Sequence, residues 1–244
     1  KIKMLKFFIF SLLISVALTV IVDSKKQNQF GEDRVSSVGA DPADSWLAYT
    51  KAAGNGRKVT YVSANWIVPS YPTNYVGSNA PGFWFGIEPA PATDLIQPIL
   101  AWADQGFQYT IFNGYYQWDN HEWLQSRSGI VKPGDHLFAY VNYVAKTNSY
   151  DSVIECKETG FKQVNNYAIE TGKLYTDVYF VLEHQPDFCD SYPADGKVTF
   201  TNITIAWEDK VEQNPHWTEN VKVPACHSKP HILSPKSVEF TWQT

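Results

Sequence analysis

Short runs of β-forming residues, separated by turn residues, recur along this chain from Ser45 almost to its last residue. In the run His136–Val144, Leu137, Ala139 and Val141 share one face and the residues between them share the other, as expected of a strand. Comparable runs are Val59–Val68, Ser152–Cys156, Tyr167–Ile169, Leu174–Glu183, Lys197–Ala206 and Val238–Trp242. No amphipathic helix longer than two turns is evident. The pattern therefore predicts an all-β fold, a two-sheet antiparallel β-sandwich of the jelly-roll or concanavalin-like kind.

The composition agrees with this fold class and excludes one class of partner. Aromatic residues make up 15% of the chain and charged residues only 18%, which fits a sandwich that has a wide aromatic-lined face. The formal net charge is −5, so the chain lacks the basic footprint of a nucleic-acid-binding protein. We expect no nucleic-acid partner.

The N-terminal part differs from the rest. Lysines precede an apolar run of 16 residues, Phe7–Val22, which polar residues then end. This layout is typical of a secretory signal peptide, and the run is short for a membrane span. We predict a signal peptide over residues 1–24, a flexible leader or short propeptide over 25–44, and a single β-sandwich domain over 45–244. The predicted location is extracellular or an acidic, lysosome-like compartment, without stable membrane association after signal removal; an uncleaved anchor is the alternative.

Two further features bear on a secreted protein. In an oxidising compartment, one pair among Cys156, Cys189 and Cys226 is expected to form a disulfide. The sequence does not decide which pair, and we favour Cys189 with Cys226. Asn202 begins an Asn-Ile-Thr triplet, which is an acceptor for N-glycosylation in a eukaryotic secretory route.

Two polar residues stand out within apolar strands. Pro81–Trp102 forms two apolar runs around a turn rich in proline and alanine, which predicts a hairpin. Gln97 lies in the second run among apolar neighbours, so its amide either finds hydrogen-bond partners or meets a ligand. Glu183 shares a strand face with Tyr179 and Val181, which taken alone indicates a strand end that reaches water.

Common catalytic signatures are absent from the sequence. It contains no Gly-x-Ser-x-Gly elbow, no phosphate loop and no Asp-Thr-Gly or Asp-Ser-Gly triplet. His121-Glu122 lacks the second histidine of a metalloprotease, because position 125 is Gln125. His227 and His231 lie near Cys226 at a spacing seen in metal sites, but no cysteine pair accompanies them, so surface histidines are the better interpretation. We expect no metal and no cofactor.

Several segments, in order, carry a resemblance to one family. They are Val59–Pro69, Phe83–Glu88 with Leu95–Gln97, Gly114–Trp118, and Val178–Glu183 followed by Gly196–Asn202. These look like the motifs of the eqolisin family, the glutamic peptidases of the scytalidoglutamic type. The resemblance spans roughly residues 45–206.

The resemblance implies a secreted acid endopeptidase in which Gln97 and Glu183 face each other across one sheet. An ionised glutamate can take a proton from water and a glutamine amide can stabilise an oxyanion, so the pair needs no metal. The resemblance also implies that Trp84, Glu88, Tyr115 and Gln117 bind substrate. The expected partner is a polypeptide substrate, and the expected state is a monomer.

The chain departs from the family pattern close to these residues. Glu88 and Gln117 stand where the family has an aspartate and a glutamate, and Pro98-Ile99 replaces a Thr-Gly pair after Gln97. Ala101 stands where a further acid is usual. These departures leave a second function open, that of an inactive relative which binds carbohydrate or cell-wall polymer.

Overall fold

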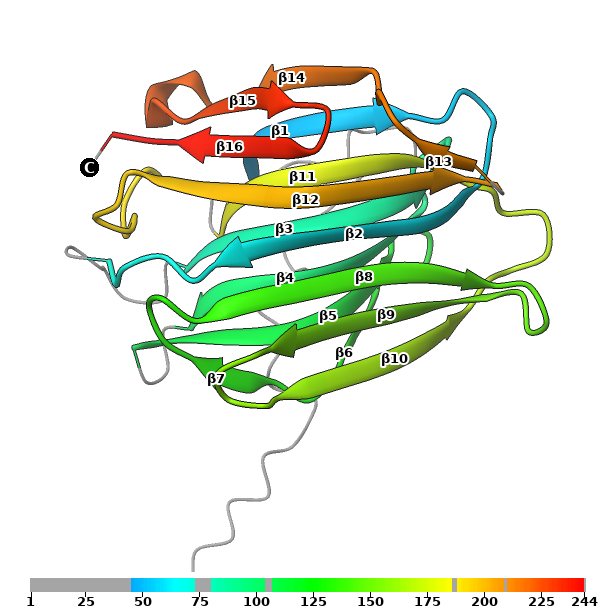
Figure 1. Cartoon of the computed structure of the whole chain (residues 1–244), viewed down its shortest axis with the longest axis horizontal. Coiled ribbons are helices and arrows are strands. Elements are labelled where there is room, and N and C mark those ends of the chain that lie inside the picture. Colours follow the sequence, from blue (N-terminus) through cyan, green and yellow to red (C-terminus); the bar gives the residue numbers. More distant parts are fainter. Residues whose placement is uncertain (1–44, 73–79, 104–106, 186–187, 209, 244) are drawn as a thin grey trace, which may run out of the picture.

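The structure is a computed structural model that describes residues 45–72, 80–103, 107–185, 188–208 and 210–243. It is a sandwich of two antiparallel eight-stranded sheets, which confirms the predicted fold class. Figure 1 looks onto one sheet, named here the front sheet, with the back sheet behind it. The proposed signal peptide and leader lie outside the described residues. In the described part of the chain, no helix is long and apolar enough to cross a membrane.

Strand order differs from sequence order in both sheets. The back sheet contains, in order, β14 (Trp217–Val221), β1 (Trp46–Ala53), β11 (Tyr175–Gln185), β3 (Ala80–Pro89), β4 (Asp94–Ala103), β5 (Gln108–Gln117) and β6 (Glu122–Gln125), with β7 (Gly129–Val131) paired to β5. The front sheet contains β10 (Lys162–Ala168), β9 (Ser149–Cys156), β8 (His136–Val144), β2 (Val59–Ile67), β12 (Lys197–Trp207), β16 (Ser237–Thr241) and β15 (Lys229–Ser234), with β13 (Lys210–Glu212) paired to β12.

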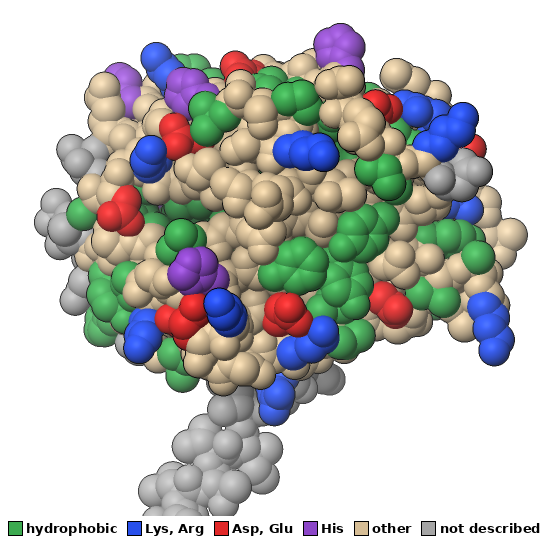
Figure 2. Space-filling model, in the orientation of Figure 1, with side chains coloured by type: hydrophobic (Ala, Val, Ile, Leu, Met, Phe, Trp, Pro, Cys, Tyr) green, Lys and Arg blue, Asp and Glu red, His purple; other side chains and the backbone are tan. Residues whose placement is uncertain are grey.

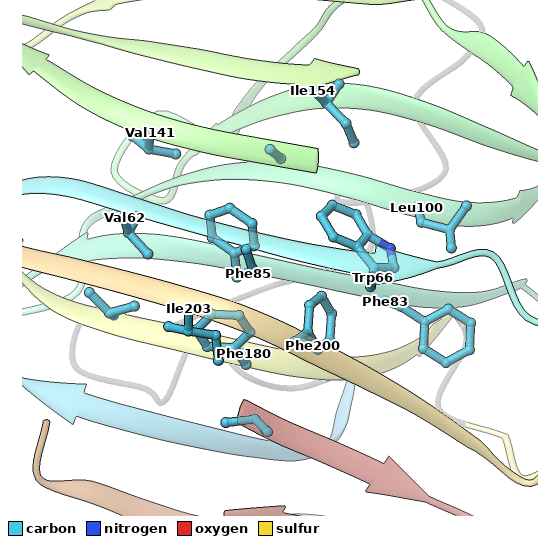
Figure 3. Packing of buried hydrophobic residues seen from close by; sticks show 14 of the residues in the cluster. Val62, Trp66, Phe83, Phe85, Leu100, Val141, Ile154, Phe180, Phe200 and Ile203 are labelled. Carbon is cyan, nitrogen blue, oxygen red and sulfur yellow. The ribbon is translucent and has the colours of Figure 1, made fainter. Parts of the chain in front are cut away.

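Aromatic side chains from both sheets interdigitate between them, as Figure 3 shows. The Trp66 ring of β2 lies 6.1 Å from Phe85 of β3, and Phe180 of β11 lies 5.1 Å from Phe200 of β12. Each of these side chains is at most 2% exposed. Complete burial of a side chain of this size contributes about 2 kcal/mol. The alternation of the strands thus directs one apolar face of each sheet into a common core.

The structure confirms the predicted hairpin around residues 89–94 but corrects a second turn. The Asn113-Gly114 pair predicts a tight turn, yet both residues lie inside the continuous strand β5. Asn113 is buried, its Nδ2 donates to the Ser152 carbonyl at 3.0 Å, and its Oδ1 accepts from the Ser152 hydroxyl at 3.0 Å. These bonds across the sandwich satisfy the amide, so tertiary contacts override the local turn preference.

A disulfide joins Cys189, after β11, to Cys226 at the end of the 3₁₀ helix η2 (Pro224–Cys226). This is the favoured pairing, and Cys156 is a free, buried thiol. The bond closes a loop of 37 residues that includes β12, β13 and β14. It therefore fixes the C-terminal strands of both sheets relative to β11.

We expect the double substitution Cys189→Ala and Cys226→Ala to lower the free energy of unfolding by about 4 kcal/mol, because the unfolded chain regains the entropy of a 37-residue loop. Equilibrium unfolding in urea measures this loss. Cys156→Ala removes a buried thiol without removing a cross-link and serves as the control. Equal losses in the two proteins would contradict a stabilising role for the disulfide.

Candidate functional site

A second apolar cluster covers the face of the back sheet that is turned away from the front sheet. We name it the outer aromatic layer. Its buried members are Trp46, Trp84, Leu95, Ile99, Ala101, Phe112, Tyr116, Trp118, Trp123, Tyr179 and Val181. The Trp46 and Trp84 rings meet edge to face at a centroid distance of 5.1 Å. The central strands of the back sheet are therefore apolar on both faces, and any polar side chain on the outer face is conspicuous.

Glu183 lies on this outer face near the end of β11. Its side chain is 4% exposed, and the indole Nε1 of Trp84 donates to its Oε2 at 2.7 Å. Across the sheet it pairs with Gly82 of β3 on one side and Trp46 of β1 on the other. A short bond to a carboxylate oxygen restricts where the carboxyl group points. Trp84 thus orients Glu183 within the layer.

Gln97 lies on the same outer face, in β4, between two glycines of the neighbouring strands. Gly114 of β5 is its register partner, and a Cβ on Gly86 of β3 would lie 3.3 Å from the Gln97 Cβ. Gln97 is 5% exposed, and its Oε1 has no hydrogen-bond partner among the described residues. An unmet buried acceptor costs about 1–3 kcal/mol. A side chain that is retained at this cost is a candidate for function.

The backbone beside Gln97 is also unusual. The described register pairs β3 with β4 at Trp84–Ile99 and at Ile87–Ile96, but at no position between these two pairs. Pro98 lies in this interval and has no N–H to donate to a neighbouring strand. Pairing of β4 with β5 continues through Pro98 without a break. The interval without described strand pairing therefore lies between β4 and β3, beside Gln97 and Gly86.

Gln97 and Glu183 are related by the register of three strands. Glu183 lies opposite Gly82 and Gln97 lies beside Gly86, with Trp84 between these glycines on β3. Two strand spacings and four residues separate the pair, which amounts to about 16 Å between Cα atoms on a flat sheet. The three side chains thus lie along one diagonal of the outer face, with the indole in the middle.

The other residues predicted for the site divide between the two faces. Glu88 shares the outer face, is 1% exposed, and is in register with Asp177 of β11. Asp177 forms an ion pair with Lys51 of β1 at 2.8 Å. Tyr115 belongs instead to the core between the sheets, and its ring lies 5.0 Å from Tyr167 of the front sheet.

The Gln117 side chain contacts Tyr115 and does not join the outer aromatic layer. Its Nε2 donates to the Tyr115 hydroxyl at 3.0 Å. The structure thus differs from the expectation that Tyr115 and Gln117 line the substrate face. From this part of the chain, Tyr116 and Trp118 are the residues that join the outer aromatic layer.

A buried ion pair that the sequence did not point to lies at this end of the sandwich. Asp94, at the start of β4, is 0% exposed and its Oδ2 lies 2.7 Å from the Lys173 ammonium. The Tyr175 hydroxyl also donates to this oxygen at 3.4 Å. Burial raises the pKa of the Asp94 carboxyl, although Lys173 opposes this shift. The pair ties the loop before β11 to β4.

This pKa shift predicts how Asp94→Asn changes the pH dependence of stability. Because the folded pKa is raised, the contribution of Asp94 is fully present below its unfolded pKa of about 3.9 and is lost as the pH rises through the folded value. Asparagine does not titrate, so we expect the unfolding free energy of the variant, relative to wild type, to rise between about pH 3 and pH 7. Urea unfolding across this range measures it, with Glu170→Gln as an exposed control on the same lysine. A falling difference would contradict the raised pKa.

The glycines beside the two polar residues give a matched pair of substitutions. A Cβ on Gly86 would lie 2.7 Å from the Ile96 carbonyl oxygen, so Gly86→Ala has to displace β4, and we expect a loss of about 1–3 kcal/mol in unfolding free energy. A Cβ on Gly82 would meet no atom closer than 3.7 Å, so Gly82→Ala is expected to stay within about 0.5 kcal/mol of wild type. Urea unfolding of both variants tests this. Equal tolerance at the two positions would show that the approach of β3 to β4 is not tight.

No group of three or more histidine, cysteine, aspartate or glutamate side chains within the described ranges is arranged to hold a metal ion. Cys226 is in the disulfide, so it is not a ligand beside His227 and His231. The chemistry that the Glu183–Trp84–Gln97 diagonal offers is that of a carboxylate, an indole N–H and a primary amide.

No protein-family model and no curated protein sequence matches this chain. Solved structures match its fold. Scytalido-glutamic peptidase with a transition state analog inhibitor matches with a TM-score of 0.62, at 21% identity over 82% of this chain and 98% of that one. SCP-B, a member of the eqolisin family of peptidases in a complex with the tripeptide Ala-Ile-His, matches with a TM-score of 0.59, at 21% identity and the same coverage. The sandwich described here is therefore the fold of the eqolisin glutamic peptidases.

Proposed function

We propose that this chain is a glutamic endopeptidase of the eqolisin family, which hydrolyses peptide bonds in acid with Gln97 and Glu183. The observation that carries the proposal is the diagonal of the outer face, where Trp84 orients Glu183 and the buried Gln97 amide oxygen has no described partner. The fold shared with the eqolisin peptidases supports it. The tripeptide named for the SCP-B structure supports a polypeptide substrate for this chain as well.

The reaction follows from the chemistry of the two side chains. Ionised Glu183 takes a proton from a water molecule while the water oxygen attacks the peptide carbonyl carbon. The Gln97 amide donates to the oxyanion that forms, and its carbonyl oxygen accepts from the attacking water. Glu183 then returns the proton to the leaving nitrogen, the C–N bond breaks, and the carboxylate is regenerated. Proton transfer by a positioned side chain of this kind contributes about 10²–10⁴-fold in rate.

The spacing of the pair sets a condition for one shared water. Glutamine and glutamate side chains each extend about 5 Å from Cα. Side chains stand roughly perpendicular to a sheet, so a shared water requires both to lean along the diagonal, in which case a separation of about 16 Å leaves about 6 Å between their ends. Two hydrogen bonds of about 2.8 Å through one water molecule span this distance. Trp84 lies between them on β3, and its indole N–H already donates to Glu183.

The disulfide supports export, because disulfides persist in oxidising compartments. We therefore place the enzyme outside the cell or in an acidic compartment of the secretory route, as a monomer. The alternative function, carbohydrate binding by aromatic stacking, needs ring faces that are open to solvent. Trp84 and Trp46 are 0% and 1% exposed, so these two rings do not offer such faces.

The test is digestion of an acid-unfolded protein at about pH 3–4, with pepstatin present to block aspartic peptidases. We expect the secreted wild type to cleave, and Glu183→Gln and Gln97→Ala each to lose at least about 100-fold in kcat/KM. Trp84→Phe keeps the ring but removes the N–H donor to Glu183, and a smaller loss of about 10-fold is expected.

Glu170→Gln is the matched carboxylate control, because that side chain is 70% exposed and lies outside the outer face. Circular dichroism confirms that each variant is folded. If folded wild type does not cleave, the proposal fails and glycan binding is tested next. If Glu183→Gln cleaves as well as Glu170→Gln, the assignment of the base is wrong.

A further inference from the structure

Asn202 lies at a β-bulge on the outer face of the front sheet. The pairing of β12 with β2 shifts by one residue between Thr201–Asn65 and Thr204–Ser63. Asn202 has a φ of 51°, in the left-handed region that asparagine tolerates better than most residues. The extra residue leaves both Thr201 and Asn202 exposed, and the Asn202 side chain has no hydrogen bond to other described residues. Its amide is therefore accessible in the folded protein.

The same face carries a small aromatic patch, which we name the β2–β8 patch. It consists of Tyr61 of β2 and of Phe138 and Tyr140 of β8. Tyr61 and Tyr140 stack at a centroid distance of 5.9 Å, and Phe138 lies 6.0 Å from Tyr140. All three are partly exposed. Figure 2 shows hydrophobic side chains gathered near the middle of this face, where Figure 1 places β2 and β8.

Short side chains separate Asn202 from the patch. Across the sheet, Thr201 pairs with Asn65 and Asn65 with Phe138, while Thr204 pairs with Ser63 and Ser63 with Tyr140. β12 and β8 are two strand spacings apart, or about 10 Å. At this point the residue between the bulge and the rings is Ser63, which has a short side chain. A group attached to Asn202 can lie flat over β2 and reach the patch.

We propose that Asn202 carries an N-linked glycan whose first sugars lie over β2 and cover the β2–β8 patch. Asn202-Ile203-Thr204 meets the acceptor requirement. In the transfer, Nδ2 forms a bond to the anomeric carbon of the first sugar, the bond from that carbon to a lipid diphosphate donor breaks, and Nδ2 loses a proton. The apolar C–H face of a sugar ring fits the face of an aromatic ring, and an exposed aromatic patch gains from such cover. This inference is independent of the proposed peptidase activity.

The modification is tested with the full chain secreted from a eukaryotic host behind the host's own secretion signal. Intact mass is measured before and after enzymatic removal of N-glycans. We expect wild type and Thr204→Ser to carry one glycan, and Asn202→Gln and Thr204→Ala to carry none. An unmodified wild-type protein overturns the site.

Contact with the patch is tested by comparing fully glycosylated protein with protein from which the glycan has been removed. We expect removal to lower the Tm of wild type by a few degrees, and to lower that of Tyr140→Ser by less than half as much. Ile130→Ser, which changes an exposed apolar residue on β7 of the other sheet, is the control and should retain the wild-type difference. An equal difference in wild type and Tyr140→Ser overturns the contact between glycan and patch.

Discussion

The back sheet is apolar on both faces, and this constraint governs the candidate site. One face packs against the front sheet and the other carries the outer aromatic layer. A polar side chain within such a layer has to be paired or has to serve a ligand. Glu183 is oriented by the Trp84 indole, whereas the Gln97 amide oxygen has no described protein partner. The contrast between a fixed carboxylate and an unsatisfied amide is what makes this pair stand out.

Much of this arrangement could be predicted from the sequence because alternation within a strand is a local property. Alternation predicts that Glu183 shares a face with Tyr179 and Val181, and it puts Gln97 on one face with Leu95 and Ile99; the structure has both groupings. In β5 the structure differs from the expected placement of Tyr115 and Gln117. Tyr115 lies in the core and Gln117 donates to its hydroxyl, whereas Tyr116 and Trp118 belong to the outer aromatic layer. Alternation tells which residues share a face, but not which face is the core, and an error of one residue exchanges the two.

Other features depend on contacts that are distant in sequence, and local signals could not supply them. The Asn113-Gly114 pair predicts a turn, yet bonds from Asn113 to Ser152 of the opposite sheet keep it in mid-strand. The Asp94–Lys173 pair joins segments nearly eighty residues apart that neither periodicity nor motif relates. Gly86 and Gly114 are recognised as neighbours of Gln97 only once the register of β3, β4 and β5 is known, and the sequence does not determine that register. The residues that carry the proposed chemistry could therefore be predicted from the sequence more readily than the small residues that make room for them.

The row Gly86–Gln97–Gly114 also constrains how such a surface can evolve. A side chain at position 114 would collide with the Trp123 indole, which comes from the edge strand β6 and lies over this glycine. The sizes of the residues at 114 and 123 are therefore coupled, although the two positions are on different strands. A larger residue at 114 fits only if the residue at 123 is smaller. A pair of substitutions that enlarges residue 114 and shortens residue 123 would replace a side chain from the edge strand β6 with one from β5. The surface next to Gln97 would then change while its backbone stays in place.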